Sequence, residues 1–387
     1  MNKRQPLYLD NNATTPVDPR VVEAMIPYFT EHFGNPSSTE HIFGIEASNA
    51  IEAAREQVAT TLGASASEIV FTGSCTESDN LAIVGTVRAA GGPQKLITSA
   101  IEHPAVLQSF RQLEREGHSV LYLDVDETGL VRLDQLERAL DDGAFLVSIM
   151  GANNEVGTLQ PLRQISELCA FKGALLHSDL AQMPAYCDVN VDSLGLDLAS
   201  LSGHKIYGPK GIGALYVRRR RPRTKLAPLT WGGGHEKGLR SGTLNTPLIV
   251  GFGQAMAFCG REWKSSARHT MEILDQIKSG VFTAIEGVQI NGHPRDRLPN
   301  NLSLSIEGIE PLALIRALRE SLAFSASSAC STDDVKTSHV LLAMFGDTPR
   351  AQRAFRLSPG RYTNQEEVAA ILPEFVESVL ELRSIAG

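Results

Sequence analysis

Hydrophobic and polar positions follow two periods along the chain. Apolar residues recur near helical spacing in four early segments, 47–62, 76–90, 104–115 and 165–172. Between them lie short apolar runs typical of buried strands, at 68–72, 95–99, 120–124, 145–150, 174–177, 196–201 and 213–217. Because short strands alternate with helices, this pattern predicts an α/β fold with a mostly parallel sheet covered on both faces.

The pattern changes near residue 260. A long helix is predicted at 262–285, a strand at 301–306, and further helices at 310–320 and 365–383. We therefore expect a large α/β domain over 15–260 and a smaller α+β domain built from 1–14 and 261–387. The segment 325–337 contains almost no residue that could anchor it in a core, so it is interpreted as a mobile surface loop.

Composition narrows the class of protein. The chain has 387 residues, of which 42% are hydrophobic and 21% charged, and this is ample for a large core. A net charge of −8 argues against a direct nucleic-acid partner or an anionic membrane surface. No apolar run reaches the roughly 20 residues that span a bilayer, and residues 1–10 lack the apolar core of a secretory signal, so the expected location is the cytoplasm.

The five cysteines are scattered, with no C-x-x-C pair. An odd number without a framework argues against a disulfide scaffold or a structural zinc site, and we expect no metal centre. One of the five could still be a reactive thiol.

Residues with chemical potential follow the predicted strands. Lys205 ends the sequence Ser-Gly-His-Lys directly after the strand 196–201. A lysine held in a dry crevice loses basicity, and its free amine can then form a Schiff base. Taken alone this signal is weak, because most lysines are solvated surface groups.

Three further features complete a pattern. Asp179 follows the strand 174–177 and could face a pyridine nitrogen, with Gln182 near the ring oxygen, although helix-capping aspartates are common. The turn 73–78 precedes a helix and could hold a phosphate, or could be an ordinary capped start. His103 could stack on a flat ring and shuttle protons, or be an ordinary loop histidine. Together these features predict a pyridoxal 5'-phosphate (PLP) site.

The chain resembles the cysteine desulfurases of the NifS/IscS family, within the class V aminotransferase group and PLP fold type I. The resemblance covers nearly the whole sequence. It is carried by Tyr-Leu-Asp-Asn-Asn-Ala-Thr-Thr-Pro at 8–16, Phe-Gly-Asn-Pro-Ser-Ser at 33–38, Thr-Glu-Ser-Asp-Asn at 76–80, Glu-His at 102–103, Asn-Asn-Glu-Val-Gly at 153–157, the stretch 202–213, Gly-Gly-Gly-His-Glu at 232–236, and Arg-Leu-Ser-Pro-Gly-Arg at 356–361.

The resemblance implies a role for each matching position. Lys205 would carry the cofactor, Asp179 would pair with its ring nitrogen, and His103 would stack on the ring and transfer protons. Asn154 and Gln182 would hold ring substituents. The phosphate would be bound by Cys75 through its backbone, Thr76, Ser202 and His204, and by Thr243 of the other subunit of a homodimer. Asn35 and Arg356 would hold the carboxylate of the substrate, and guanidinium suits that task independently.

Cys330 matches the family's nucleophile, in a loop whose length resembles the long IscS-like type. The implied reaction converts L-cysteine to L-alanine and leaves a persulfide on Cys330. A sulfur-acceptor protein would take the sulfur, for iron–sulfur clusters on a scaffold or for thiocofactor or tRNA thiolation. A mobile loop suits this role, because one thiol must visit both the cofactor and an outside acceptor. We expect a basic partner to favour the thiolate, and His103 is the candidate.

Two positions depart from the family. Cys75 stands where many relatives have alanine, and we interpret it as a backbone donor with an inert side chain rather than a redox group. IscS-type enzymes carry a C-terminal extension that docks the iron–sulfur scaffold; its apparent absence after Gly387 argues against that particular partnership. Of the other cysteines, Cys169, Cys187 and Cys259 are expected in the core. The basic run 218–221 is interpreted as a solvated face or as a dock for an acidic acceptor.

Two alternatives stay open from the residues. Another PLP enzyme of the same fold, such as a selenocysteine lyase or an aminotransferase, would share the lysine and the acid. An aminotransferase would not need Cys330. A non-catalytic PLP-binding adaptor is the other alternative, but it would not need a competent residue at every catalytic position.

Overall fold

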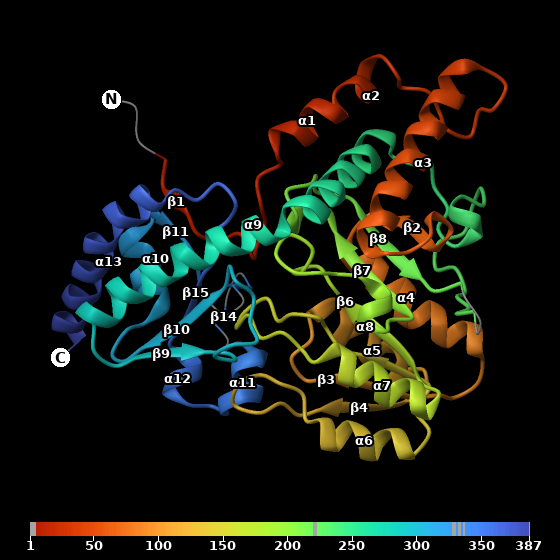
Figure 1. Ribbon diagram of the computed structural model, residues 1–387. Coiled ribbons are helices and arrows are strands. Elements are labelled where there is room, and N and C mark those ends of the chain that lie inside the picture. The colour runs from red at the N-terminus through yellow and green to blue at the C-terminus, as the bar shows by residue number, and fades with distance from the viewer. Residues whose placement is uncertain (1–4, 220–222, 327–329, 332–333, 336, 387) are drawn as a thin grey trace.

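The computed structural model describes residues 5–219, 223–326, 330–331, 334–335 and 337–386. Its centre is a seven-stranded sheet in the order β2-β8-β7-β6-β5-β3-β4 (Figure 1). The strands are β2 (Ile69–Thr72), β3 (Lys95–Ser99), β4 (Ser119–Leu123), β5 (Leu146–Ser148), β6 (Leu175–Asp179), β7 (Leu198–Ser202) and β8 (Gly213–Val217). Only β8 runs antiparallel to its neighbours, so the prediction of a mostly parallel α/β fold is confirmed.

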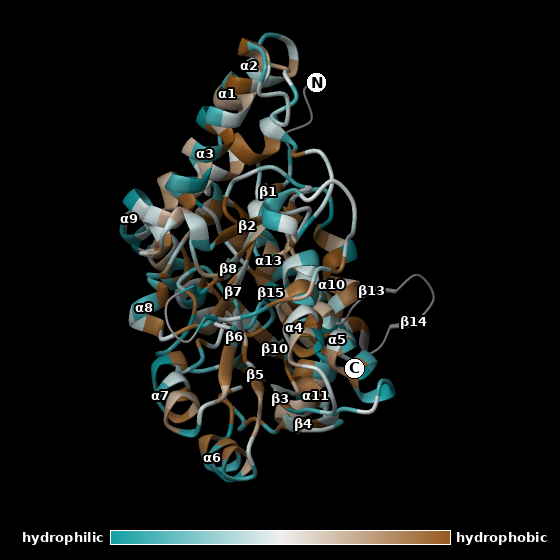
Figure 2. Cartoon of the chain, turned by 90° about the vertical axis from the view of Figure 1, so that its right-hand side faces the viewer, coloured by the Kyte–Doolittle hydropathy of each residue, from teal (hydrophilic) through white to brown (hydrophobic). Residues whose placement is uncertain are grey.

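Alternate residues of each strand point to opposite faces of the sheet. On one face, strand residues such as Val70 and Leu146 pack with α4 (Cys75–Ala90) and α5 (Pro104–Arg115). On the other face, neighbours such as Phe71 and Val147 pack with α3 (Ile42–Leu62), α6 (Leu133–Asp141), α7 (Leu162–Lys172) and the first part of α9 (Thr246–Ala284). Helices therefore cover both faces, and hydrophobic residues concentrate on the strands between them (Figure 2).

A second sheet lies in the C-terminal part of the chain. It is antiparallel, in the order β12-β15-β10-β9, and consists of β9 (Val288–Asn291), β10 (Leu302–Ile306), β12 (Ser325–Ala326) and β15 (Ala354–Leu357). It shares a separate core with α10 (Pro311–Leu318) and α13 (Gln365–Ala386). Leu9 joins this core because β1 (Leu7–Tyr8) pairs with β11 (Leu322–Ala323). The division at residue 260 stays a prediction, and one helix, α9, runs across it.

The predicted start of that helix at 262 is wrong by a full four turns. It begins at Thr246, where the Asn245 side chain accepts a hydrogen bond from the Leu248 backbone, and it continues for 39 residues. The glycines of 251–260 hid this stretch, because glycine disfavours helix interiors. Here they allow close packing: a Cβ on Gly253 would lie 2.6 Å from the Gln57 side chain and 2.7 Å from Ala54 of α3.

Several short elements were not predicted at all. They include α1 (Pro19–Met25), α2 (Pro27–Thr30), α8 (Val191–Leu194), α11 (His339–Phe345) and α12 (Pro349–Gln352). Within the predicted loop 325–337, β13 (Cys330–Ser331) pairs with β14 (Asp334–Val335), and residues 327–329, 332–333 and 336 lie outside the described residues. Among the helices of the described ranges, none combines the length and apolar character needed to cross a bilayer.

Candidate functional site

A cavity of about 350 Å³ opens where the parallel strands end. Its size suits a small ligand, and this edge of an α/β sheet is where ligands usually bind. Nine of the ten residues predicted to hold the cofactor line it: Cys75, Thr76, His103, Asn154, Asp179, Gln182, Ser202, His204 and Lys205. The structure therefore brings together groups that are up to 130 residues apart in sequence, because β2, β3, β5, β6 and β7 each end at this edge.

Lys205 closes the 3₁₀ turn that follows β7, and the residue is half-buried. The amine donates hydrogen bonds to the backbone oxygens of Asn12, at 2.5 Å, and Ala13, at 2.9 Å. Burial, followed by the positive charge of Arg356, lowers the pKa of Lys205 to about 8. A substantial fraction of this amine is therefore neutral near physiological pH, which a nucleophilic amine requires.

Acidic groups gather at the other wall of the cavity. Asp179, the last residue of β6, is 8% exposed, and its Oδ1 accepts from the Ala181 backbone at 2.8 Å and from the Cys75 thiol at 3.4 Å. Oxygens of Asp179 and Asp79 and the Cys75 sulfur all lie within 4.8 Å of one another. Burial, followed by the charge of Asp179, raises the pKa of Asp79 well above its ordinary value. The buried carboxyl of Asp79 therefore gives up its proton less readily than an ordinary aspartate.

The start of α4 forms a cradle for an anion. Ser74 caps this helix by accepting from the Glu77 backbone at 3.1 Å, and Cys75 and Thr76 begin its first turn. Unpaired backbone N–H groups at a helix start attract phosphate. Gly213 of β8 packs against the start of α4. A Cβ at this position would lie 2.7 Å from the Ser74 carbonyl carbon and 3.0 Å from the Cys75 nitrogen, so a larger residue would displace the turn.

Two histidines border the cavity in their neutral forms. Burial, followed by the charge of Lys205, lowers the pKa of His204 to about 4. His103 is the N-cap of α5, and its Nδ1 accepts from the Ala105 backbone at 3.1 Å. Burial also lowers the pKa of His103. With Nδ1 occupied as an acceptor, the neutral ring carries its proton on Nε2.

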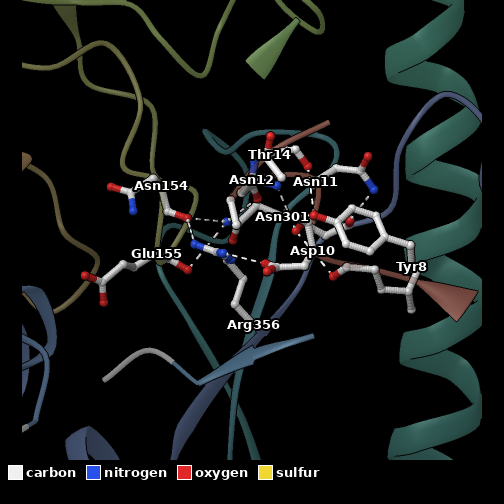
Figure 3. A network of polar contacts seen from close by, with 12 residues as sticks. Tyr8, Asp10, Asn11, Asn12, Thr14, Asn154, Glu155, Asn301 and Arg356 are labelled. Atoms are coloured by element: carbon white, nitrogen blue, oxygen red, sulfur yellow. Dashed lines mark hydrogen bonds and ion pairs between the residues drawn. The ribbon is translucent and has the colours of Figure 1, made fainter. Parts of the chain in front are cut away.

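Arg356 of β15 lies between the N-terminal segment and the loop after β5 (Figure 3). One guanidinium nitrogen donates to Asp10 at 2.7 Å and another to the backbone oxygen of Asn154 at 2.8 Å. The charge of Arg356 is, after burial, the second cause of the lowered pKa of Lys205. Arg356 contacts Asn154, which lines the cavity, but it is not itself among the described residues of that lining, and its role as a carboxylate ligand stays a prediction.

Two predicted residues stay apart from these. Asn35, in the segment between α2 and α3, is exposed, and its Oδ1 accepts from the Ser37 backbone at 3.0 Å. Thr243, just before α9, is also exposed. Neither is among the described residues that line the cavity of this chain.

The cysteines differ in their surroundings. Cys169 and Cys259 are buried as expected, whereas Cys187 is only half-buried against the main core. Burial, followed by the charges of Asp179 and Asp79, raises the pKa of the Cys75 thiol well above its ordinary value, which agrees with an inert side chain. The backbone of Cys330 lies in β13, opposite Val335, and its side chain is not described.

The N-terminal segment holds site residues that sequence reasoning missed. Asn12 exchanges two hydrogen bonds with Gln182, of 2.9 and 3.0 Å, and accepts at its Oδ1 from Asn301 at 2.9 Å. Asp10 holds Arg356. Apart from the family motif at 8–16, the sequence offers only a run of polar residues after Leu9, and that run does not indicate contacts some 170 to 346 residues away.

Known proteins resemble this chain along its whole length. Residues 7–371 match the family described as aminotransferase class-V. A protein of Rickettsia bellii (strain OSU 85-389) named cysteine desulfurase IscS is 44% identical over 382 residues, which are 98% of this chain and 93% of the relative.

Solved structures agree with that match. A NifS-like protein superposes with a TM-score of 0.90 at 40% identity, covering 97% of this chain and 99% of the other. The structure titled SspA in complex with cysteine has a TM-score of 0.81 at 38% identity, covering 92% of this chain and all of the other, 100%.

Proposed function

The chain belongs to the aminotransferase class-V family, and from this premise we propose that it is a PLP-dependent cysteine desulfurase that releases L-alanine from L-cysteine. The observation that carries the proposal is the single cavity in which Lys205, Asp179, His103 and the start of α4 meet. Relatives of similar length carry the same activity in their names.

The residues of the cavity fit PLP. The start of α4 with Ser202 and His204 would hold the phosphate, because Gly213 leaves the turn room to present its N–H groups. Asp179 would face the ring nitrogen, with the buried carboxyl of Asp79 beside it. Asn154 and Gln182 would contact the ring substituents. When bound, PLP would supply an aldehyde that condenses with amines and a ring that acts as an electron sink for the substrate Cα.

The remaining steps fall to groups of this chain. Arg356 would bind the carboxylate of L-cysteine through two nitrogens in exchange for its contacts with Asp10 and Asn154. The amine of Lys205, with its pKa of about 8, can take and return a proton at the substrate Cα. His103 lines the cavity and would move protons there, with its own ring proton on Nε2 while Nδ1 caps α5.

Cys330 would receive the sulfur. Its thiol attacks the substrate sulfur, the C–S bond breaks, an S–S bond forms, and the substrate carbon takes a proton to become L-alanine. The tether supports this role: Ser325 pairs with Arg356, and four residues from Ala326 to Cys330 span at most about 14 Å. Cys330 therefore stays within reach of the substrate-binding arginine.

A second copy of this chain would complete the enzyme. Four large side chains near Asn35 are strongly exposed, and we name them the apolar edge: Phe29 at 58%, Phe33 at 65%, Ile42 at 59% and Phe43 at 47%. They gather at α2 and the start of α3, at the top of the molecule in Figure 1. Exposed aromatic groups of this size are typical of interfaces. In a two-fold homodimer joined here, Thr243 would reach the phosphate of the partner.

Sulfur would leave as a persulfide handed to an acceptor protein, for iron–sulfur cluster assembly or for thiocofactor and tRNA thiolation. We place this activity in the cytoplasm. We also propose the two-domain division, with 15–260 holding the cofactor and 1–14 with 261–387 carrying Arg356 and Cys330.

One experiment tests the proposal. The purified protein is incubated with L-cysteine, and alanine release and the mass of the Cys330 peptide are measured. We expect alanine and a mass increase of one sulfur, and borohydride should fix the cofactor on the Lys205 peptide. Cys330→Ser should keep the visible absorbance of the cofactor while sulfur transfer is lost. A cofactor fixed elsewhere, or an unchanged Cys330→Ser variant, would refute it.

A further inference from the structure

Three side chains of kinds that bind metal ions meet at one wall of the cavity. They are the thiol of Cys75 and the carboxyls of Asp79 and Asp179, whose sulfur and oxygen atoms all lie within 4.8 Å of one another. All three residues line the cavity. No other set of three such groups lies this close together in the part of the chain that the structure describes.

Helix α4 and strand β6 bring this cluster together. Cys75 is the first residue of α4 and Asp79 follows four positions later, so both side chains project from one face of the helix. Asp179 ends β6 and meets them from the sheet, 104 residues after Cys75 in the chain. The sequence led us to expect no metal centre, because ligands so far apart form no recognisable spacing until the strand lies beside the helix.

Asp79 is buried without a partner that would offset its desolvation. The residue is 0% exposed, and neither carboxyl oxygen makes a hydrogen bond of ordinary geometry with any described residue. His177 Nε2 lies 3.7 Å from Asp79 Oδ1, and that nitrogen pairs instead with Ser200 Oγ at 2.9 Å. The amine of Lys205 donates to two backbone oxygens of the N-terminal segment. Because an unpaired buried carboxyl is costly, a cation at this wall would be stabilising.

The spacing of the ligand atoms suits a zinc ion. Zn–S bonds are about 2.3 Å and Zn–O bonds about 2.0–2.2 Å, so a sulfur and an oxygen at a tetrahedral angle lie about 3.5 Å apart. The Cys75 sulfur is 3.4 Å from Asp179 Oδ1. The other separations, of at most 4.8 Å, would shorten by about 1 Å as Asp79 turns toward the ion. The cavity leaves the fourth position to water.

The mixture of ligands selects the class of metal. A thiolate favours Zn²⁺ and similar ions over Mg²⁺ and Ca²⁺, which prefer oxygen ligands alone. Binding needs no redox partner: the Cys75 thiol releases its proton to solvent as the Zn–S bond forms, and no electron is transferred.

We propose that the cofactor-free cavity binds Zn²⁺ through Cys75, Asp79 and Asp179, and that Zn²⁺ and PLP exclude each other. The second half rests on the proposed function, because it takes Asp179 as the partner of the ring nitrogen. The Asp179 carboxylate cannot face that nitrogen while it holds a metal ion. Zinc would thus oppose the loading of cofactor-free chains, whereas bound cofactor would protect the site.

Cobalt reports the thiolate directly. The full-length chain is freed of cofactor and titrated with Co²⁺, which accepts the ligands of Zn²⁺ and gives a near-ultraviolet charge-transfer band when a thiolate binds it. The Kd for Zn²⁺ is then measured by competition with a chromophoric chelator. We expect one ion per chain, a charge-transfer band that Zn²⁺ abolishes, and no displacement by Mg²⁺. Wild-type protein that binds Co²⁺ without the band would overturn the assignment of Cys75.

Variants locate the site. Cys75→Ala should lose the band and raise the Kd for Zn²⁺ at least roughly tenfold, since one of three protein ligands is gone. Asp79→Asn should keep the band but also weaken binding, which separates ligand loss from a failure to fold. Cys187→Ala and Cys330→Ser are the matched controls and should retain both the band and the Kd. A band that survives in Cys75→Ala, or disappears in either control, would place the metal on another thiol and refute the site.

Competition tests the exclusion. PLP is titrated by absorbance into the cofactor-free protein, with and without Zn²⁺ at about ten times its Kd, and the apparent Kd for PLP should rise roughly tenfold. In Cys75→Ala the ratio of the two values should fall close to one. A ratio near one in zinc-loaded wild type would overturn the exclusion. Protein that binds Zn²⁺ at these residues but takes up no PLP would refute the proposed function, and the exclusion with it, but not the metal site.

Discussion

The pKa of Lys205 leads to a direct measurement. An ordinary lysine has a pKa near 10.4, and at pH 7.5 about one amine in a thousand is then neutral. With the pKa lowered to about 8 by burial and by Arg356, about a quarter of the Lys205 amines are neutral at that pH. The cavity thus raises the concentration of reactive amine by roughly two orders of magnitude.

Competitive labelling measures this fraction residue by residue. The cofactor-free protein is treated with trace acetic anhydride between pH 6 and 11, since the reagent acetylates only neutral amines, and the Lys205 peptide is quantified by mass spectrometry. The exposed Lys210, five residues away, corrects for changes in the reagent itself. We expect the labelling of Lys205 to reach half its maximum near pH 8.

Two substitutions should move that midpoint in opposite directions. Arg356→Gln removes a positive charge that lowers the pKa of Lys205, so the midpoint should rise. Asp179→Asn removes a negative charge that raises the pKa, so the midpoint should fall. A wild-type midpoint at pH 10 or above, or a downward shift in Arg356→Gln, would refute the reasoning.

Three further predictions follow from contacts described above. Gly213→Ala should weaken PLP binding at least roughly tenfold, as measured by absorbance titration, because its Cβ would press within 2.7 Å on the Ser74 backbone. Arg55→Met should destabilise the protein by about 3–5 kcal/mol in urea unfolding by leaving Glu236 buried without its partner, and adding Glu236→Gln should recover part of the loss. Burial lowers the pKa of His177 to about 3, so stability present above its unfolded pKa of about 6.5 is lost as pH falls toward 3. This group should cost about 2 kcal/mol at pH 5, and His177→Gln should reduce the slope of stability against pH.

From the sequence we could predict the positions of those candidate site residues that follow directly from strand ends and helix starts. Asp179, Ser202 and Lys205 lie at or just after strand ends, and parallel strands bring such ends together whatever the loops do. The same logic placed Thr76 at a helix start. These predictions needed only the period of the apolar residues and the chemistry of the polar ones.

Contacts between segments far apart in the sequence could not be predicted from these local patterns. The role of Asn12 arises because β1 pairs with β11, more than 300 residues later, and nothing local indicates the pairing. The start of α9 was missed for a related reason. Its glycines weaken the local helix preference, and only their close packing against α3 offsets that loss. Helix and strand propensities depend on the residues of one segment, whereas the contacts of Asn12 and the start of α9 depend on packing between two segments.

The N-terminal segment implies a late step in folding. The backbone N–H of Asn11 donates to Ser358 at 3.0 Å, Asp10 holds Arg356, and Asn12 and Ala13 accept from Lys205. Residues 10–13 are synthesised some 346 residues before Arg356, so loop-closure entropy delays these contacts until that part of the chain exists. The two backbone oxygens that accept from Lys205 lie on this segment, so its docking against β15 would also fix the surroundings of the amine.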